Sequence, residues 1–262
     1  MSRSVQGGAR VDLAVQKRRI IDQAPLIMQS ISSFPSLFDS VLTLPAVVAK
    51  RDLILAAASR VFIEQGFEGT TMALVAKAAG VARRTLYNQF PDGKESLFSA
   101  VAERMWRAFP VMDIATDEDA LSDPEAGLRR IGYGVAAFWA PPLAVAFLRM
   151  VIAEGPRFPD LTRRFFEVGK TPAVSAVRNY IAELGRRGTL NVINPALASA
   201  QFLGMIDESV LWVRVMGSEK KLTKAQINDV VEQAVTIFLG HYGQAEGKLR
   251  TSSQSTNSPK AK

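Results

Sequence analysis

Residues 71–90 read TMALVAKAAGVARRTLYNQF, and this stretch predicts two short helices joined by a tight turn. Thr71 is placed to cap the first helix, because its hydroxyl accepts a hydrogen bond from a backbone N–H that the helix leaves unpaired. Apolar residues then recur at helical spacing, beginning with Leu74 and Val75. Gly80 tolerates the left-handed conformation that turns a chain sharply after a helix. The second helix therefore follows the turn at Gly80, with Arg83 and Arg84 at its start.

The second of these helices presents polar side chains on its outer face. Val81 and Leu86 are its apolar anchors, which leaves a polar set to face outward. The set is Arg83, Arg84, Thr85, Tyr87, Asn88 and Gln89. Because such groups hydrogen-bond to bases and phosphates, the segment predicts a helix-turn-helix whose second helix reads DNA.

The pattern extends across three helices and the start of a fourth. The pieces are Ile54-Leu55-Ala56-Ala57-Ala58, Val61-Phe62, Gly66-Phe67, Thr70-Thr71, Val75-Ala76, Ala79-Gly80-Val81, Thr85-Leu86-Tyr87, Phe90, Lys94-Glu95 and Leu97-Phe98. Together they make residues 50–98 resemble the DNA-binding domain of the TetR/AcrR family of bacterial transcriptional regulators. One helix-turn-helix alone is weak evidence, whereas a match over this length is specific.

The resemblance implies a role for each polar residue of the predicted reading surface. Arg83 and Arg84 are the expected base contacts, because a guanidinium bonds both acceptors of guanine; a merely solvated charged face is the alternative. Asn88 and Gln89 are expected to read adenine or to meet phosphate at the far end of the helix. The expected phosphate contacts are Thr71, Thr85, Tyr87 and Lys94. For Lys94→Ala we predict weaker binding to all sequences and a salt dependence flatter by about one unit.

The chain departs from the family pattern at two places. Ala82 stands where many members carry serine or another small polar residue, so the second helix lacks a side-chain cap and a phosphate contact. The segment Pro91-Asp92-Gly93 is one residue longer than the commonest spacing before the Lys-Glu pair. Neither change breaks the predicted fold.

Charge is distributed unevenly along the 262 residues, whose formal net charge is +7. Residues 48–110 hold nine lysines and arginines against six acidic residues, and residues 111–216 hold eleven against twelve. This agrees with a basic reading domain that meets phosphate, although a protein with basic tails has the same totals. The hydrophobic content of 48% is enough for a buried core, and the length favours two domains.

Residue types needed for several chemistries are absent from the sequence. There is no cysteine, and His241 is the only histidine. This excludes disulfides, thiolate nucleophiles, Cys/His zinc sites and a Cys–His pair. No Walker lysine motif and no Gly-x-Gly-x-x-Gly stretch occurs either. We therefore expect no enzymatic activity, no cofactor and no metal site.

The positions of helix-breaking proline and glycine residues divide the chain into four expected parts. They are a flexible extension at 1–47, a helix-turn-helix domain with a linking helix at 48–110, a helical sensing and dimerisation domain at 111–242, and a disordered tail at 243–262. The extension is either an unstructured segment or a basic arm that reaches along DNA. A start of translation further downstream, for example at Met28, is a further alternative.

The predicted helices make the fold all-α. They span residues 47–65, the helix-turn-helix and residues 94–109, with an acidic connecting loop at 113–123. Further helices start at Pro124, at Pro141-Pro142, at Pro159 with a kink allowed at Pro172, at Pro195 and at Thr223. No segment reaches the roughly 20 apolar residues that a membrane-spanning helix needs, so a cytoplasmic protein is expected.

Aromatic and apolar residues of the second domain are candidates for a ligand pocket, the feature with which the family senses small molecules. The expected lining is Phe138, Trp139, Phe147, Met150, Phe166, Phe202 and Met205. An apolar stripe at helical spacing is more often plain core, so both interpretations stay open for each residue. Arg149, Asp207 and Glu208 are polar positions in apolar helices that either orient a ligand or face solvent. Residues 148–159 also resemble the AefR-like branch of the family.

The last two predicted helices carry apolar stripes that suit a homodimer. The expected interface comprises Leu203, Ile206, Val210, Val213, Ile227, Val230, Val231, Ala234 and Phe238. Two such helices from each subunit pack as a four-helix bundle, whereas packing within one subunit is the alternative. A dimer would place two reading helices about one DNA turn apart on a palindrome.

Together these features predict a ligand-responsive regulator of transcription. We expect a repressor that binds a palindromic double-stranded DNA operator as a homodimer and is released by a small-molecule effector. The alternative is an interaction module on the same fold that regulates through a partner protein, without a small-molecule ligand.

Overall fold

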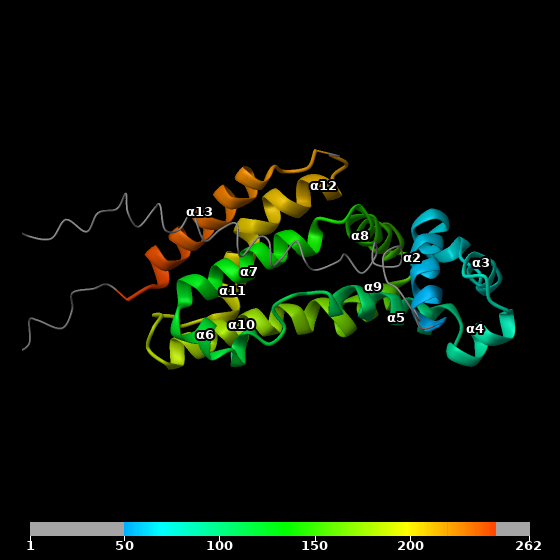
Figure 1. The fold of residues 1–262 in the computed structure, drawn as a ribbon, viewed down its shortest axis with the longest axis horizontal. Helices are drawn as coiled ribbons and strands as arrows, with labels where there is room; N and C mark the ends of the chain where they lie inside the picture. Colours follow the sequence, from blue (N-terminus) through cyan, green and yellow to red (C-terminus); the bar gives the residue numbers. More distant parts are fainter. Residues whose placement is uncertain (1–49, 219, 245–262) are drawn as a thin grey trace, which may run out of the picture.

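The computed structural model describes residues 50–218 and 220–244, and across these residues the fold is all-α (Figure 1). The predictions for the 1–47 extension and for all but the first two residues of the 243–262 tail lie outside the described residues. Helices α2 (Lys50–Gly69), α3 (Met72–Ala78) and α4 (Arg83–Gln89) lie together at one end of an elongated molecule. α5 (Lys94–Arg107) leads from this end into the larger helical body.

The turn between α3 and α4 has the geometry that the sequence predicts. The hydroxyl of Thr71 accepts a hydrogen bond from the backbone N–H of Leu74 at 3.2 Å and so caps α3. Gly80 has a φ of 65°, which is the left-handed conformation expected after the first helix. Leu86 is fully buried and anchors α4 in the hydrophobic core. The helix-turn-helix is thereby formed.

An aromatic cluster joins the end that carries α2–α4 to the larger body. Phe62 of α2 packs edge-on against Phe98 of α5, with ring centroids 5.7 Å apart. Phe98 in turn stacks on Phe147 of α8 (Pro142–Glu154) at 5.4 Å. Since all three rings are buried, one continuous core runs from the DNA-binding end into the second domain.

Proline starts four helices of the larger body, as expected from its fixed φ and missing N–H. These helices are α7 (Pro124–Trp139), α8, α9 (Pro159–Phe165) and α11 (Pro195–Asp207). α10 (Thr171–Arg186) has proline in its first turn, and α13 (Lys224–Tyr242) begins with a capping box at Thr223. α13 packs on α7 and α11, which closes the body on the side away from α10 (Figure 1).

Two π-helical turns interrupt the long helices of this body. η3 (Phe166–Lys170) joins α9 to α10, and η4 (Glu208–Trp212) joins α11 to the short α12 (Val213–Val215). The predicted kink near Pro172 is thus a π turn directly before α10. Such turns widen a helix by one residue and often occur at functional sites.

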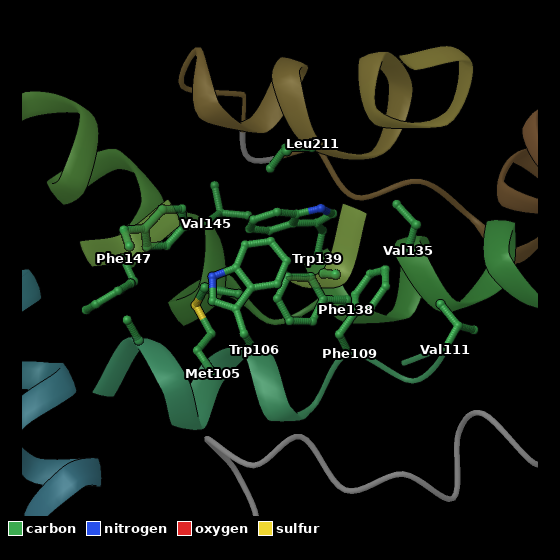
Figure 2. Close-up of a cluster of buried hydrophobic side chains, with 14 of the residues drawn as sticks. Met105, Trp106, Phe109, Val111, Val135, Phe138, Trp139, Val145, Phe147 and Leu211 are labelled. Atoms are coloured by element: carbon green, nitrogen blue, oxygen red, sulfur yellow. The ribbon is translucent and has the colours of Figure 1, made fainter. Parts of the chain in front are cut away.

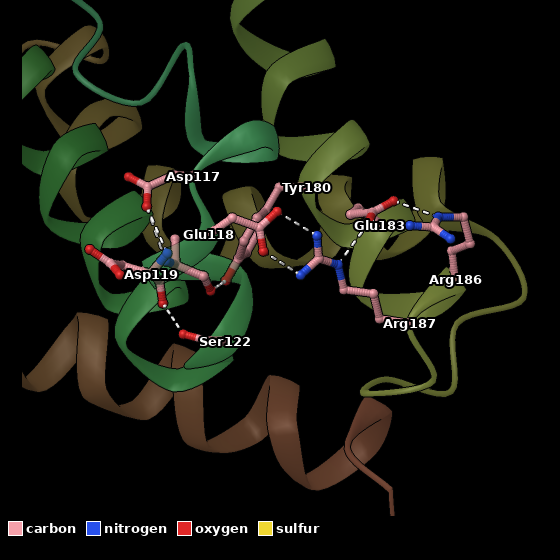
Figure 3. A network of polar contacts seen from close by, with 9 residues as sticks. Asp117, Glu118, Asp119, Ser122, Tyr180, Glu183, Arg186 and Arg187 are labelled. Carbon is pink, nitrogen blue, oxygen red and sulfur yellow. Dashed lines mark hydrogen bonds and ion pairs between the residues drawn. The ribbon is translucent and has the colours of Figure 1, made fainter.

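The acidic segment 113–123, predicted as a connecting loop, is partly helical. It contains the 3-10 turn η2 (Ile114–Thr116) and α6 (Glu118–Ser122). Asp117 caps α6 by accepting hydrogen bonds from the backbone N–H groups of Asp119 and Ala120 at 3.1 and 3.2 Å. The helix is held to α10 because the buried hydroxyl of Tyr180 donates to the carbonyl of Ala120 at 2.7 Å (Figure 3). The prediction of a loop was wrong here, since local capping and burial outweigh the acidic composition.

Within the described ranges, no single helix is long and apolar enough to cross a membrane. α7 and α8 meet the length and composition only as a pair, and they are bent by 77° relative to each other.

Candidate functional site

The N-terminal turn of α4 carries two solvent-exposed arginines. Arg83 and Arg84 are exposed, and neither forms an ion pair with any residue that the structure describes. Ala82 occupies the N-cap without a side-chain hydrogen bond, as the sequence indicates. Tyr87 and Asn88 are also exposed on this helix. The surface therefore presents unpaired guanidinium groups, the arrangement that suits contact with base edges or phosphates.

The remaining predicted contacts are less accessible. Thr85 and Gln89 are partly buried, and Oε1 of Gln89 is buried without a hydrogen-bond partner among the described residues. Thr71 is exposed but already uses its hydroxyl to cap α3. The structure therefore gathers the eight predicted residues at one end of the molecule without making them equally available.

Lys94 has contacts that the sequence does not reveal. Its Nζ donates hydrogen bonds to the backbone carbonyls of Phe67 at 2.8 Å and Glu68 at 3.1 Å. The ammonium also lies 4.6 Å from the centre of the Phe67 ring, a cation–π distance. Lys94 consequently ties the first turn of α5 to the end of α2, in addition to any role it has toward DNA.

A large cavity lies in the second domain between α5, α8, the α9–η3–α10 region and α11. Its volume is about 760 Å³, which is the size expected for a small-molecule site. The inner wall includes Trp106 of α5 and Phe109 just after it, Val135 and Trp139 of α7, and Leu211 of η4 (Figure 2). Ile152, Phe166 and Trp212 also line it while remaining 42–48% exposed, so they form its open side.

Only part of the predicted pocket lines this cavity. Trp139 and Phe166 do, whereas Phe138, Phe147, Met150, Phe202 and Met205 do not. Phe138 stacks on Trp106 at 4.7 Å and Phe202 packs against Phe238 at 5.2 Å, so these rings are core. The pocket prediction is corrected for these five residues. Helical spacing shows which face of a helix is buried, but it does not show whether that face contacts the core or a cavity.

The cavity wall holds one acid and one base among its described lining residues, Asp207 and Lys170. Asp207 ends α11, directly before the π turn η4, and Lys170 ends the other π turn, η3. Burial raises the pKa of the Asp207 carboxyl to about 6, and the charge of Lys170 and a hydrogen bond from the Trp139 side chain partly oppose this effect. The other two polar positions noted in the sequence do not line the cavity: Glu208 is exposed, and Arg149 donates to the carbonyl of Val215 at 3.1 Å.

The turn that follows α8 contacts both the cavity and the DNA-binding end. Gly155 lines the cavity. Three residues further on, the ring of Phe158 packs edge-on against Phe67, with centroids 5.2 Å apart. Arg157 forms an ion pair with Glu68 at 2.5 Å. One short segment therefore borders the cavity and the end of α2 at the same time.

The predicted dimer residues divide into core and surface. Ile206, Val210, Val231, Ala234 and Phe238 are buried within the protomer, which leaves them no surface to offer a partner. Leu203, Ile227 and Val230 are partly exposed, and Val213 is 46% exposed. Leu203 also lines the cavity. The outer faces of α11 and α13 instead show Leu197 and Ile237, which are more than half exposed.

Two family models match this chain. Residues 54–101 match the model for bacterial regulatory proteins of the tetR family, and residues 126–244 match the C-terminal domain of AefR-like transcriptional repressors. The chain is also 35% identical over 79 residues to the HTH-type transcriptional regulator LmrA of Bacillus subtilis, an alignment that spans 42% of that relative. The resemblance seen in the sequence is thus confirmed for both parts.

Solved structures agree over the full length of the proteins compared. A TetR-family transcriptional regulator from Mesorhizobium loti has a TM-score of 0.62 and 28% identity, covering 74% of this chain and 97% of that one. The flavonoid-responsive regulator FrrA has a TM-score of 0.60 and 30% identity, with the same coverage. The chain belongs to the TetR family of bacterial transcriptional regulators, a class of DNA-binding proteins that are not enzymes.

Proposed function

We propose that this protein is a ligand-responsive repressor that binds a palindromic operator as a homodimer in the cytoplasm. The observation that carries the proposal is the combination of an open helix-turn-helix at one end of the molecule and a cavity of about 760 Å³ in the body. A repressing mode is supported by the match of residues 126–244 to a domain named for AefR-like repressors.

The DNA-binding part of the proposal rests on α4. Its two exposed arginines have no intramolecular ion pair in the described chain, so DNA contact costs them no existing bond. Reading a palindrome requires two copies of α4 in a fixed relation, which a dimer supplies.

For the dimer we propose the outer faces of α11 and α13. Leu197 and Ile237 are 52% and 57% exposed, and large apolar side chains on a helix face favour burial against a partner. Leu203, Val213, Ile227 and Val230 are the partly exposed members of the predicted set, on α11, α12 and α13, and the other five are buried within the protomer. Two helices from each subunit would then pack as a four-helix bundle.

For release from DNA we propose that a ligand in the cavity favours a different placement of the α8–α9 turn. That turn borders the cavity at Gly155 and contacts α2 through Phe158 and Phe67. A ligand shifts the equilibrium only by its difference in affinity for the two arrangements. FrrA is named as flavonoid-responsive, so flavonoids are the first compounds to test.

The test is binding of the purified protein to its own upstream DNA and to scrambled DNA over a range of salt, with and without a flavone. We expect preference for a short palindrome and weaker binding when the flavone is present. Equal binding to both DNAs would contradict an operator-specific regulator. Operator affinity that stays unchanged with a compound shown to occupy the cavity would contradict ligand responsiveness.

A further inference from the structure

Two polar groups in the cavity wall have unmet hydrogen bonds. Oδ1 of Asp207 and Nε1 of Trp106 are both buried, and neither has a hydrogen-bond partner in the described chain. Both residues line the same cavity, but the Nε1 edge of Trp106 packs against Gly169, where an added Cβ would lie 2.4 Å from Nε1. Asp207 is only partly buried as a residue, so its carboxylate is the group of the two that a molecule in the cavity can reach. A buried acceptor without a donor destabilises the folded protein, and a ligand hydroxyl would relieve that cost.

The carboxylate of Asp207 is partly supported by the protein. A hydrogen bond from the Trp139 side chain and the charge of Lys170 both favour its ionised form. Neither of these satisfies Oδ1, which finds no donor among the described residues. Because a carboxylate turns readily about its last torsion, either oxygen can be presented to a molecule in the cavity.

The opposite charges at the wall favour a ligand without net charge. Asp207 and Lys170 are its one acid and its one base among the described lining residues, and they carry opposite charges. A cationic ligand that meets Asp207 would also meet Lys170, and an anion that meets Lys170 would meet Asp207. In an apolar enclosure such like-charge contacts are weakly screened. A neutral hydroxyl avoids both penalties.

The apolar walls favour a flat aromatic ligand. Trp106, Trp139, Phe165 and Trp212 contribute ring surfaces, and aromatic rings gain from offset stacking and edge-to-face contact beyond their buried area. A cavity of about 760 Å³ holds a molecule of two or three fused or linked rings.

We propose that Asp207 is the polar anchor of the cavity and that the effector is a neutral, planar aromatic compound with a hydroxyl. The hydroxyl donates to the carboxylate of Asp207. The proposal rests on the proposed sensing function and names the ligand chemistry of that site.

The experiment uses a monohydroxyflavone, its methyl ether and unsubstituted flavone as probes, at a pH where the hydroxyl is neutral. Calorimetry measures their affinity for the full-length protein and for two variants, Asp207→Asn and Glu208→Gln. Glu208 is the adjacent, exposed carboxylate and does not line the cavity, so Glu208→Gln removes the same charge from the same segment. Unchanged circular dichroism and melting behaviour establish that each variant is folded.

We expect the native protein to bind the hydroxyflavone roughly ten- to a hundredfold more tightly than the methyl ether, the range for a hydrogen bond to a charged acceptor. Asp207→Asn should remove most of that preference, and Glu208→Gln should keep it. Equal binding of the hydroxyflavone and its ether by the native protein would overturn the anchor. A preference that survives in Asp207→Asn, or no binding by any probe, would overturn it too.

A parallel measurement of operator affinity separates this inference from the proposed function. The hydroxyflavone can bind in an Asp207-dependent way while operator affinity stays constant. That result would support the role of Asp207 in ligand binding and contradict ligand-induced release from DNA. If the hydroxyflavone and its ether release DNA with equal potency, regulation stands and the anchor is wrong.

Discussion

The carboxylate of Glu154 lies against Gly66, with Oε1 2.3 Å from the point where a Cβ on that glycine would stand. Glu154 is the last residue of α8, and Gly66 marks the kink inside α2, where φ is 69° and ψ is 173°. The second domain therefore touches the DNA-binding end at the one point of α2 that leaves helical geometry. A residue with a side chain would be strained at this backbone conformation and would also collide with Glu154.

Gly66→Ala should lower the free energy of unfolding by about 1–3 kcal/mol, the usual cost of a strained backbone conformation. Thermal or urea unfolding followed by circular dichroism measures this. Gly69→Ala is the matched control, since Gly69 closes the same helix and the contact nearest to its added Cβ is an ordinary 3.5 Å. Equal stability of the two variants would show that the kink is not strained.

Phe158→Ala should reduce the effect of ligand on operator affinity while leaving the affinity of the free protein for DNA nearly unchanged. Phe158 packs on Phe67, so its loss weakens the contact between the cavity border and α2. The coupling free energy between two sites of an allosteric protein is typically about 1–3 kcal/mol. We expect Phe158→Ala to lose at least half of the coupling free energy between ligand and operator. DNA titrations with and without the hydroxyflavone give this quantity.

Arg157→Ala is the companion variant for this measurement. Arg157 pairs with Glu68 at the same junction, but both side chains are more than half exposed. Exposed ion pairs contribute little, so the coupling should change far less than in Phe158→Ala. The opposite order of effects would assign the coupling to charge rather than to packing.

Arg83→Ala and Arg84→Ala should relax base preference at individual operator positions, at a cost of about 1–3 kcal/mol for the preferred base. Binding to a set of operators with every single-base change measures this directly. Arg107→Ala is the control, because Arg107 is exposed at the far end of α5 and pairs with Glu103. Weakening that is uniform across all bases would identify the two arginines as phosphate contacts.

Lys94→Met should destabilise the protein as well as weaken DNA binding. The substitution keeps most of the apolar stem but removes both hydrogen bonds to the carbonyls of Phe67 and Glu68. A loss of about 1–3 kcal/mol is expected from the partly buried carbonyl left without its charged donor. Urea unfolding measures it, with Lys77→Met on the exposed face of α3 as the control. No loss of stability would leave Lys94 with a role toward phosphate alone.

Asp207→Asn should make the protein more stable at neutral pH. The folded-state pKa of Asp207 is about 6 against an ordinary value of 3.8, so the folded protein binds more protons between these values than the unfolded chain. Its contribution to stability therefore falls as pH rises from about 4 to 6, by about 2–3 kcal/mol in total. Lys170 is the charged group that faces Asp207.

The measurement is the difference in unfolding free energy between Asp207→Asn and the native protein as a function of pH. The difference should be smallest near pH 4 and grow toward pH 7. Glu208→Gln, at the exposed neighbouring carboxylate, is measured alongside as the matched variant. A constant difference would mean that Asp207 does not titrate with a raised pKa.

The helices were largely predictable because their ends carry local signals. Pro124, Pro159 and Pro195 each start a helix, and Gly80 makes the predicted left-handed turn. The two π turns were not predictable, since Phe166–Lys170 and Glu208–Trp212 continue the apolar periodicity of ordinary helices. Their extra residue in the turn is a product of tertiary packing.

The candidate site was less predictable than the fold. Trp139 and Phe138 are adjacent in the sequence and both buried, yet only Trp139 lines the cavity. Trp106 and Lys170 line the cavity but were not predicted from the sequence. The cavity forms where α5 and the end of η3 pack against other helices. The spacing of residues along one helix does not reveal which other helices it packs against. Asp207 was noticed in the sequence as a polar residue in an apolar helix, which was the one available signal.

All three tryptophans of the chain, at positions 106, 139 and 212, line the cavity. The indole fluorescence of the unmodified protein therefore originates entirely from the walls of its candidate sensing site. A compound that enters will change the polarity around these fluorophores or quench them directly. The protein thus carries its own optical reporter, and compound libraries can be screened for effectors before an operator or a regulated gene has been identified, and without attaching a label.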